Sequence, residues 1–442
     1  MPAYESFREP ITKMADGTIK QLNPFSGTEV WTVPGRANRP LGIKNPDPQP
    51  VNEEDLGRHC AFCTQRVLET PPEKARLVRR GDDAEIIHTD SVDMLSRQWE
   101  FRRVPNLFEI LSFDYWAMNY DYRLTPEASK RLEAYVADPA GRAHVMGVLR
   151  TKYASRMTSE EFDELSEGEK MAGAYSFFGG GHDLVVAKRH FVDGATMDTE
   201  LASSGTLTPQ EHEWYMRLTI DAMKDLYATN RYVRYVQVFQ NWLKPAGASF
   251  DHLHKQLVAI DQRTVNGRME VEKVRKNPNL YNEAGINYAG YHNLIIAENT
   301  HAVAIAGFGH RYPTLEVWSK SEHIQPWEHT REEQAAMSDL VHAMHAATGS
   351  DVPTNEEWYT KPKDSDVNMP WRILLKWRVS TLAGFEGGSK IYVNTIDPWS
   401  LRDRVVPQLL ELRAEGKLAR NINIATECSC EINALKYNPE LQ

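Results

Sequence analysis

The 442-residue chain has few cysteines, no long apolar run and no basic cluster. Four cysteines are too few for a disulfide scaffold in a chain of this length. No window approaches the roughly 18 consecutive apolar residues of a transmembrane helix, and the N-terminus lacks the pattern of a secretory signal. The formal net charge of −10 argues against a nucleic-acid partner. We therefore expect a cytoplasmic protein that binds neither nucleic acid nor membrane.

The remaining composition is that of a globular protein with a large core. Apolar residues make up 41% of the chain and charged residues 25%, and 11 Trp and 18 Tyr argue against disorder. The length allows two or three domains.

The order of the expected elements repeats along the chain. Strands are expected before and after a long helix that Thr208 and Pro209 begin, and the same order recurs around a helix that begins after Thr330. This repetition predicts an α+β protein with two units of similar build. The expected segments are an N-terminal arm (1–21), a first unit (22–265) with a helical insertion (about 114–170), a second unit (286–416) and a C-terminal tail (417–442).

The sequence His252-Leu-His254-Lys-Gln256 leads into the apolar run Leu257–Ile260, which reads as a buried strand. Alternate side chains of a strand share a face, so His252, His254 and Gln256 are expected to point the same way. Buried imidazole and amide groups cost free energy unless each has a partner. The stretch is therefore a candidate for chemistry.

The cysteines fall into two close pairs, and the first is a candidate metal site. Cys60-x-x-Cys63 supplies two thiolates, and a tetrahedral zinc ion needs two further nitrogen or sulfur ligands. His182 and His252 both stand at strand edges beside glycine-containing loops, which makes them reachable. The alternatives are free thiols and ordinary core histidines. Cys428 and Cys430 are expected to be exposed and have no assigned role.

The histidine motif resembles that of the histidine-triad superfamily of nucleotide hydrolases and transferases, whose transferase branch carries Gln where the hydrolases have a third His. Several short motifs resemble the galactose-1-phosphate uridylyltransferase family in the same order. They are Asn23-Pro with Arg36-Ala-Asn-Arg39-Pro, Cys60-x-x-Cys63, Val104-Pro-Asn106, Gly181-His182, Asn241, Gly247-Ala-Ser249 and Ala383-Gly-Phe385-Glu386. The resemblance covers about residues 22–410 and implies two tandem histidine-triad-like units, each a mainly antiparallel sheet with helices.

The resemblance implies a nucleotidyltransferase of galactose metabolism. It would move a nucleoside monophosphate between an NDP-sugar and a sugar 1-phosphate, and UMP is the nucleotide that the resemblance favours. His254 would be the nucleophile and Gln256 would hydrogen-bond the phosphoryl oxygen. One structural Zn²⁺ would be held by Cys60, Cys63, His182 and His252. The nucleotide and phosphate site would be lined by Arg36, Arg39, Asn106, Asn241, Gly247 and Ser249, and the sugar contacted by Phe385 and Glu386, in this family often across a homodimer interface.

Elementary chemistry supports these roles. A neutral imidazole is a competent nucleophile at neutral pH, and Arg side chains suit phosphate oxygens. Gln256 can donate a hydrogen bond but cannot deliver a proton, so a phosphate acceptor is expected to be preferred over water. Without the family context, Arg36 and Arg39 could equally lie on a solvated loop, and ordinary turn chemistry could explain Asn106, Asn241 and Ser249.

The chain also departs from the family pattern. Leu253 replaces the usual Pro, Lys255 replaces a small residue, and the segment 371–378 lacks a His-x-His motif, so a second metal site is not predicted. Ser380 stands where some members have a Lys that binds the sugar phosphate. Two alternative functions follow: a phosphorylase of the same fold that splits an NDP-sugar or dinucleotide, and a nucleotide-binding protein without turnover.

Overall fold

The structure is a computed structural model that describes residues 9–35, 42, 45, 47–88, 98–380 and 382–441. A twelve-stranded sheet runs through the molecule, and each pair of neighbouring strands in it is antiparallel. In spatial order its strands are β16 (Asn423–Ile424), β10 (Ile295–Glu298), β11 (Ala302–Ala306), β12 (Thr314–Ser319), β14 (Arg372–Trp377), β13 (Thr354–Tyr359), β8 (Tyr235–Trp242), β9 (His254–Ile260), β7 (His182–Ala187), β6 (Phe101–Pro105), β4 (Ala75–Arg80) and β5 (Asp83–His88).

The sheet has the same strand order on both sides of its central β8–β13 pair. Outward from the centre, β8-β9-β7-β6-β4 on one side corresponds to β13-β14-β12-β11-β10 on the other. A long helix precedes each central strand: α6 (Pro209–Thr229) before β8 and α9 (Arg331–Thr348) before β13. The expected α+β class is confirmed, and this mirrored order is what two tandem units would produce.

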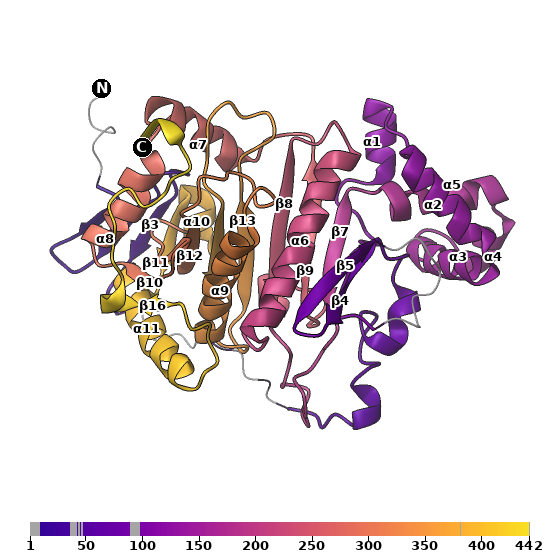
Figure 1. The fold of residues 1–442 in the computed structure, drawn as a ribbon, viewed down its shortest axis with the longest axis horizontal. Helices are drawn as coiled ribbons and strands as arrows, with labels where there is room; N and C mark the ends of the chain where they lie inside the picture. Colours follow the sequence, from indigo (N-terminus) through magenta and orange to yellow (C-terminus); the bar gives the residue numbers. More distant parts are fainter. Residues whose placement is uncertain are drawn as a thin grey trace.

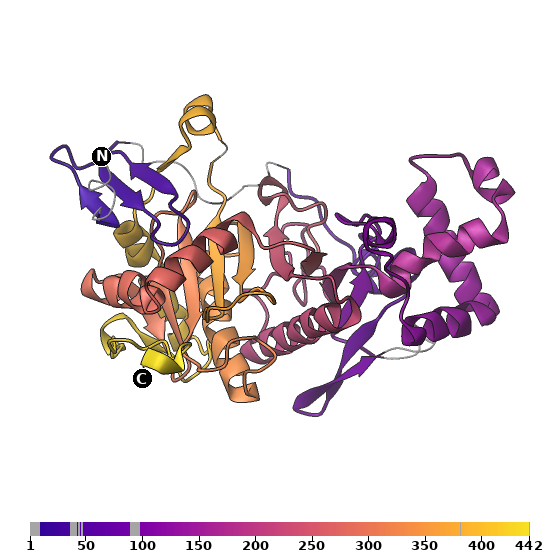
Figure 2. The same ribbon diagram turned by 90° about the horizontal axis from the view of Figure 1, so that it is seen from above.

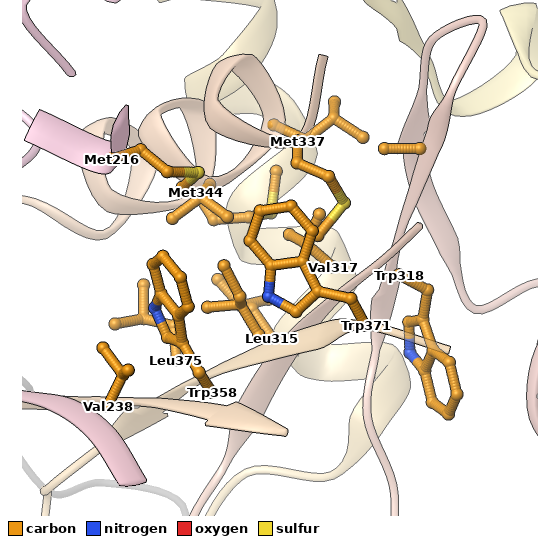
Figure 3. Close-up of a cluster of buried hydrophobic side chains, with 14 of the residues drawn as sticks. Met216, Val238, Leu315, Val317, Trp318, Met337, Met344, Trp358, Trp371 and Leu375 are labelled. Atoms are coloured by element: carbon orange, nitrogen blue, oxygen red, sulfur yellow. The ribbon is translucent and has the colours of Figure 1, made fainter. Parts of the chain in front are cut away.

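One face of the sheet is covered by α6, α9 and α11 (Pro398–Ala414), which lie side by side (Figure 1). Figure 3 shows the core under α9, where Met337 and Met344 face Leu315 of β12, Trp358 of β13 and Trp371, which directly precedes β14. The signals at the start of α6 are confirmed, because the Thr208 side chain accepts from the backbone N–H of Glu211 and Pro209 is the first helical residue. The opposite face of the sheet carries the side chains of His182, His254 and Gln256.

The helical insertion forms a separate layer at one end of the molecule (purple in Figures 1 and 2). Its side chains make their own cluster around Leu149, Phe162 and Phe177. Its helices are α1 (Phe113–Tyr120), α2 (Pro126–Ala137), α3 (Pro139–Tyr153), α4 (Ser159–Glu164) and α5 (Glu167–Gly179). α5 leads through Gly180 and Gly181 directly into β7, so the insertion adjoins the strand that begins at His182.

A smaller sheet lies at the other end of the molecule and pairs an N-terminal segment with a strand from the second half of the chain. It contains β1 (Ile11–Lys13), β2 (Ile19–Leu22), β3 (Glu29–Thr32) and β15 (Ile391–Asn394), with β15 parallel to β3. The remaining helical segments are α7 (Val265–Lys276), the π-helix η4 (Asn282–Asn287), α8 (Tyr288–Tyr291), α10 (Gly384–Ser389) and the 3₁₀ segments η1 (Glu53–Asp55), η2 (Thr64–Glu69), η3 (Lys244–Ala246), η5 (Ala425–Glu427) and η6 (Pro439–Leu441).

Both expected terminal extensions contribute strands. The segment 1–21 carries β1 and most of β2, and the segment 417–442 carries β16, which pairs with β10, and the fully buried Tyr437. In the described part of the chain, no helix combines the length and apolarity needed to cross a bilayer.

Candidate active site and metal centre

Strand β9 carries the motif that the sequence singled out, and its register places the side chains. His254 lies opposite Val186 of β7, and Gln256 lies opposite Leu184. Directly opposed residues share a face, so His254 and Gln256 both point away from α6, as expected. Lys255 points into the opposite face and is fully buried there.

The His254 ring is held in one tautomer by the backbone. Its Nδ1 lies 2.7 Å from the carbonyl oxygen of His252, so Nδ1 carries the proton and donates it. Nε2 therefore carries the lone pair, and no hydrogen bond from the described residues occupies it. Burial lowers the pKa of His254 to about 4, which keeps the ring neutral at pH 7. The Phe62 ring packs against it at 5.2 Å between centroids.

Four side chains converge in a cluster with the composition of a metal site: Cys60, Cys63, His190 and His252. The two sulfurs are 3.8 Å apart, and the sulfur–Nδ1 distances are between 3.4 and 3.8 Å. A tetrahedral ion with metal–sulfur and metal–nitrogen bonds of about 2.3 and 2.0–2.1 Å separates its ligands by roughly these distances. Nε2 of His252 donates to the carbonyl oxygen of Ala187 at 2.7 Å, the outer hydrogen bond typical of a ligating histidine. The residues present therefore fit a tetrahedral metal ion.

The structure corrects one predicted ligand: His182 does not belong to this cluster, and His190 takes its place. His182 begins β7 whereas His190 follows the end of that strand. Because β7 and β9 are antiparallel, His252 lies beside Ala187, five residues and about 17 Å along the strand from His182. Of these two histidines, His190 reaches the cysteines because it follows the end of β7.

His182 instead contacts Gln256 and the loop after β6. Its Nε2 lies 3.1 Å from Oε1 of Gln256 and also 3.1 Å from Nδ2 of Asn106. The backbone N–H of Ile110 donates to its Nδ1 at 3.3 Å. The structure thus brings Asn106 and Gln256 together, with a buried histidine between them.

Asn241, Gly247 and Ser249 lie on the β8–β9 connection. Asn241 Nδ2 approaches the carbonyl oxygen of Gly247 at 3.4 Å, Gly247 has a φ of +90°, and Ser249 is exposed on the loop before the histidines. The sequence did not point to two further residues beside them. Asn355 donates to Oδ1 of Asn241 at 2.7 Å, and Arg378 donates to Oδ1 of Asn355 at 2.5 Å. Asn355 and Arg378 both come from the second half of the chain, and the pairing of β8 with β13 brings them beside Asn241.

In the described part of the chain, no contact joins Phe385 or Glu386 to this site. Arg36 and Arg39 lie outside the described residues. Phe385 and Glu386 are on α10, in the second half of the chain. Phe385 is 52% exposed and packs beside Trp31, whereas both carboxylate oxygens of Glu386 accept backbone N–H groups, from Ala383 and Val393.

A buried ion pair lies on the reverse face of β9. Lys255 Nζ is 2.5 Å from Glu356 Oε1, and both side chains are inaccessible to solvent. His345 Nε2 lies 2.7 Å from the other oxygen of Glu356. Burial raises the pKa of Glu356, but the charge of Lys255 and the interactions with His345 together outweigh burial and hold that pKa below its usual range. The pair links β9 to β13 across β8.

Comparisons with known proteins agree with this architecture. The family profile described as "Domain of unknown function (DUF4921)" matches residues 14–437. A curated ADP-glucose phosphorylase of Arabidopsis thaliana is 23% identical over 388 residues, which cover 84% of this chain and 88% of that protein.

Two solved structures share the fold. An ADP-glucose phosphorylase from Arabidopsis thaliana with bound ADP-glucose aligns with a TM-score of 0.57 at 18% identity. A GalT-like protein from Arabidopsis thaliana aligns with a TM-score of 0.55 at 17% identity. Each alignment covers 88% of this chain and 98% of the other. The chain belongs to the DUF4921 family and shares the α+β fold of the ADP-glucose phosphorylase and the GalT-like protein.

Proposed function

We propose that this chain is a nucleotidyltransferase that takes a nucleoside monophosphate from an NDP-sugar onto His254 and passes it to a phosphate acceptor. The observation that carries the proposal is the hydrogen bond from Nδ1 of His254 to the backbone carbonyl of His252. It leaves Nε2 of a neutral ring as the only nucleophilic nitrogen, and it stabilises the positive charge that the ring gains when Nε2 is phosphorylated.

The reaction consists of two displacements at the α-phosphorus. In the first, Nε2 of His254 forms a bond to phosphorus while the bond to the bridging oxygen breaks, so sugar 1-phosphate leaves. In the second, a phosphate oxygen of the acceptor attacks the same phosphorus and the phosphorus–nitrogen bond breaks. Sugar 1-phosphate as acceptor regenerates an NDP-sugar, whereas inorganic phosphate gives a nucleoside diphosphate. Neither step consumes water, and the reaction has ping-pong kinetics.

The residues around His254 supply placement and charge. Gln256 would donate an amide N–H to the phosphoryl oxygen, and phosphoryl transfer depends mainly on such positioning. The other nucleotide- and phosphate-lining residues that we propose are Arg36, Arg39, Asn106, Asn241, Gly247 and Ser249.

Cys60, Cys63, His190 and His252 would hold the metal ion, and the thiolate and imidazole donors suit zinc. A hydrogen bond from the Cys60 thiol lowers the pKa of Cys63 and so favours its thiolate. The role of the ion is structural, because the backbone carbonyl of its ligand His252 orients His254.

The acceptor is the point on which two related functions differ. The resemblance to uridylyltransferases favours sugar 1-phosphate, with UMP as the transferred group and galactose as a substrate sugar. The 23% identical relative is named as an ADP-glucose phosphorylase, which favours adenine, glucose and inorganic phosphate. Both reactions share the nucleotidyl-His254 step, so the first half of the proposal does not depend on the choice.

A panel of acceptors separates these functions. The protein is incubated with ADP-glucose, UDP-glucose or UDP-galactose together with labelled inorganic phosphate or labelled sugar 1-phosphate. We expect label to enter a nucleoside diphosphate or the NDP-sugar, and His254→Ala to abolish both products. His301→Ala, on the turn between β10 and β11, serves as the control and should retain activity. Tight nucleotide binding with neither product would instead indicate a binding protein without turnover.

We also propose that the protein acts as a homodimer in which Phe385 and Glu386 of one copy contact the sugar in the site of the other. The exposure of Phe385 supports this role, because 52% of this large apolar residue is accessible in the single chain. Glu386 holds α10, which presents Phe385, since its carboxylate accepts the backbone N–H groups of Ala383 and Val393. Light scattering should show a dimer, and Phe385→Ala should raise KM for the NDP-sugar.

A further inference from the structure

His182 is a buried histidine with both ring nitrogens engaged, and the proposed chemistry does not yet use it. Its side chain is on the same face of the sheet as His254 and Gln256, and it is only 2% exposed. The Ile110 N–H donates to Nδ1, so Nδ1 carries the lone pair and Nε2 carries the proton. Nε2–H therefore donates to Oε1 of Gln256, 3.1 Å away. Burial lowers the pKa of His182 to about 4, which keeps the ring neutral at pH 7, and the Ile110 N–H sets its tautomer.

The backbone that carries His182 is anchored from the other face of the sheet. Its neighbour Asp183 accepts from Lys74 Nζ at 2.8 Å and from Arg103 Nε at 2.8 Å. Lys74 also donates to the carbonyl oxygen of Gly180 at 3.1 Å. These buried ion pairs hold the first residues of β7 against β6, so the His182 ring has a rigid base.

This contact decides which end of the Gln256 amide is available. A carboxamide has one accepting end and one donating end, and a free Gln side chain can exchange them by rotation. With Oε1 held by His182, the amide nitrogen becomes the free end, and no hydrogen-bond partner for it is found among the described residues. A phosphoryl oxygen needs a donor and is repelled by a carbonyl oxygen, so only this orientation is productive.

We propose that His182 is a positioning residue that holds the Gln256 amide with its N–H groups toward the phosphoryl group carried by His254. The inference rests on the proposed function. Asn106 Nδ2 also lies 3.1 Å from Nε2 of His182, but both groups are donors once Ile110 occupies Nδ1. Asn106 is thus a neighbour of the pair and leaves the Gln256 contact intact.

A double-mutant cycle tests the coupling. His182→Leu, Gln256→Ala and the double variant are compared for the rate of nucleotidyl-enzyme formation in single turnovers with the NDP-sugar that the wild type accepts. We expect each single variant to be slower by about 10²-fold, with KM little changed, and the double variant to be no slower than Gln256→Ala. His182→Gln, whose amide can reach the position of Nε2, should recover most of the rate. Effects that multiply in the double variant would overturn the proposal.

A second measurement does not depend on turnover, so it separates this inference from the proposed function. Long-range ¹H–¹⁵N spectra of the histidine-labelled full-length protein report the tautomer of each ring, and His182→Leu assigns the signals. We expect His182 to be neutral with the proton on Nε2 from pH 8 down to about pH 5, and Gln256→Leu to perturb its Nε2–H signal. A proton on Nδ1, or titration near the pKa of a free imidazole, would overturn the proposal even in an active enzyme.

Discussion

Two histidines two residues apart use opposite ring nitrogens, and this difference divides their tasks. His252 directs Nδ1 to the cysteines and donates Nε2–H to Ala187, whereas His254 donates Nδ1–H to the backbone of His252 and keeps Nε2 free. The metal centre and the candidate nucleophile are therefore coupled through one carbonyl group. Loss of the ion should disturb the orientation of the His254 ring as well as the stability of the fold.

The ligand set gives a direct prediction. Cys63→Ser and His190→Ala should each lose the bound metal, measured by elemental analysis, because a structural zinc site needs all four ligands. Without the ion, Tm should fall by at least ~5 °C. His182→Ala should keep a full equivalent of metal, and Cys430→Ser is the surface control. Metal loss in His182→Ala with retention in His190→Ala would contradict the assignment.

The sequence predicted three members of the metal-site cluster, Cys60, Cys63 and His252, and the misplaced fourth ligand has a physical cause. The shared face of His254 and Gln256 follows from the period of a strand, and Cys60-x-x-Cys63 is a local motif. The fourth ligand depends on which end of β7 meets the start of β9, and a single sequence does not show the direction and register of that pairing. His190, three residues after the strand ends, would have been the choice once β7 and β9 were known to be antiparallel.

At the scale of elements, the Lys255–Glu356 pair fixes β9 relative to β13 from the face opposite the site. Lys255→Met leaves Glu356 as a buried carboxylate without its cation, which costs about 3–5 kcal/mol of unfolding free energy. Replacing both residues, in Lys255→Met/Glu356→Leu, should recover most of that loss. Urea unfolding at pH 7 measures the three proteins, and a single variant as stable as the wild type would show that the pair contributes nothing.

The loss of stability in Lys255→Met should depend on pH. In the wild type the depressed pKa of Glu356 contributes stability at neutral pH, and this contribution decreases as the pH falls below the unfolded value of about 4.3. In Lys255→Met the carboxyl group loses that cation and takes up a proton at higher pH, with His345 and the indole N–H of Trp358 as its remaining polar partners. The stability gap between wild type and variant should therefore narrow between pH 7 and pH 5. A gap that stays constant or widens would contradict this assignment.

Local sequence signals predicted where single helices begin better than they predicted which distant segments of the chain contact one another. Thr208 and Pro209 mark the start of α6 because a cap and a first-turn proline act within one turn. The parallel pairing of β3 with β15 joins segments more than 350 residues apart, and no local pattern encodes it. The Asn355 and Arg378 contacts to the Asn241 region were missed for the same reason.

At the scale of the whole molecule, one sheet spans both halves of the chain, and its centre is the β8–β13 pair. A fragment ending at residue 262 would expose the long edge of β8, and an unpaired central strand promotes aggregation. We expect that fragment to be insoluble alone and to become soluble when residues 263–442 are co-expressed, as judged by size-exclusion chromatography. A soluble monomeric fragment that unfolds cooperatively would show that the halves are independent domains.

The central claim is that His254 carries the nucleoside monophosphate, and intact-mass spectrometry tests it most directly. The protein is mixed with ADP-glucose or UDP-glucose without an acceptor, quenched and weighed, and the modified peptide is located by fragmentation. The account predicts one added nucleoside monophosphate on His254, released by inorganic phosphate or sugar 1-phosphate and absent in His254→Ala. Turnover of either NDP-sugar without such an adduct, or an adduct that persists in His254→Ala, would contradict it.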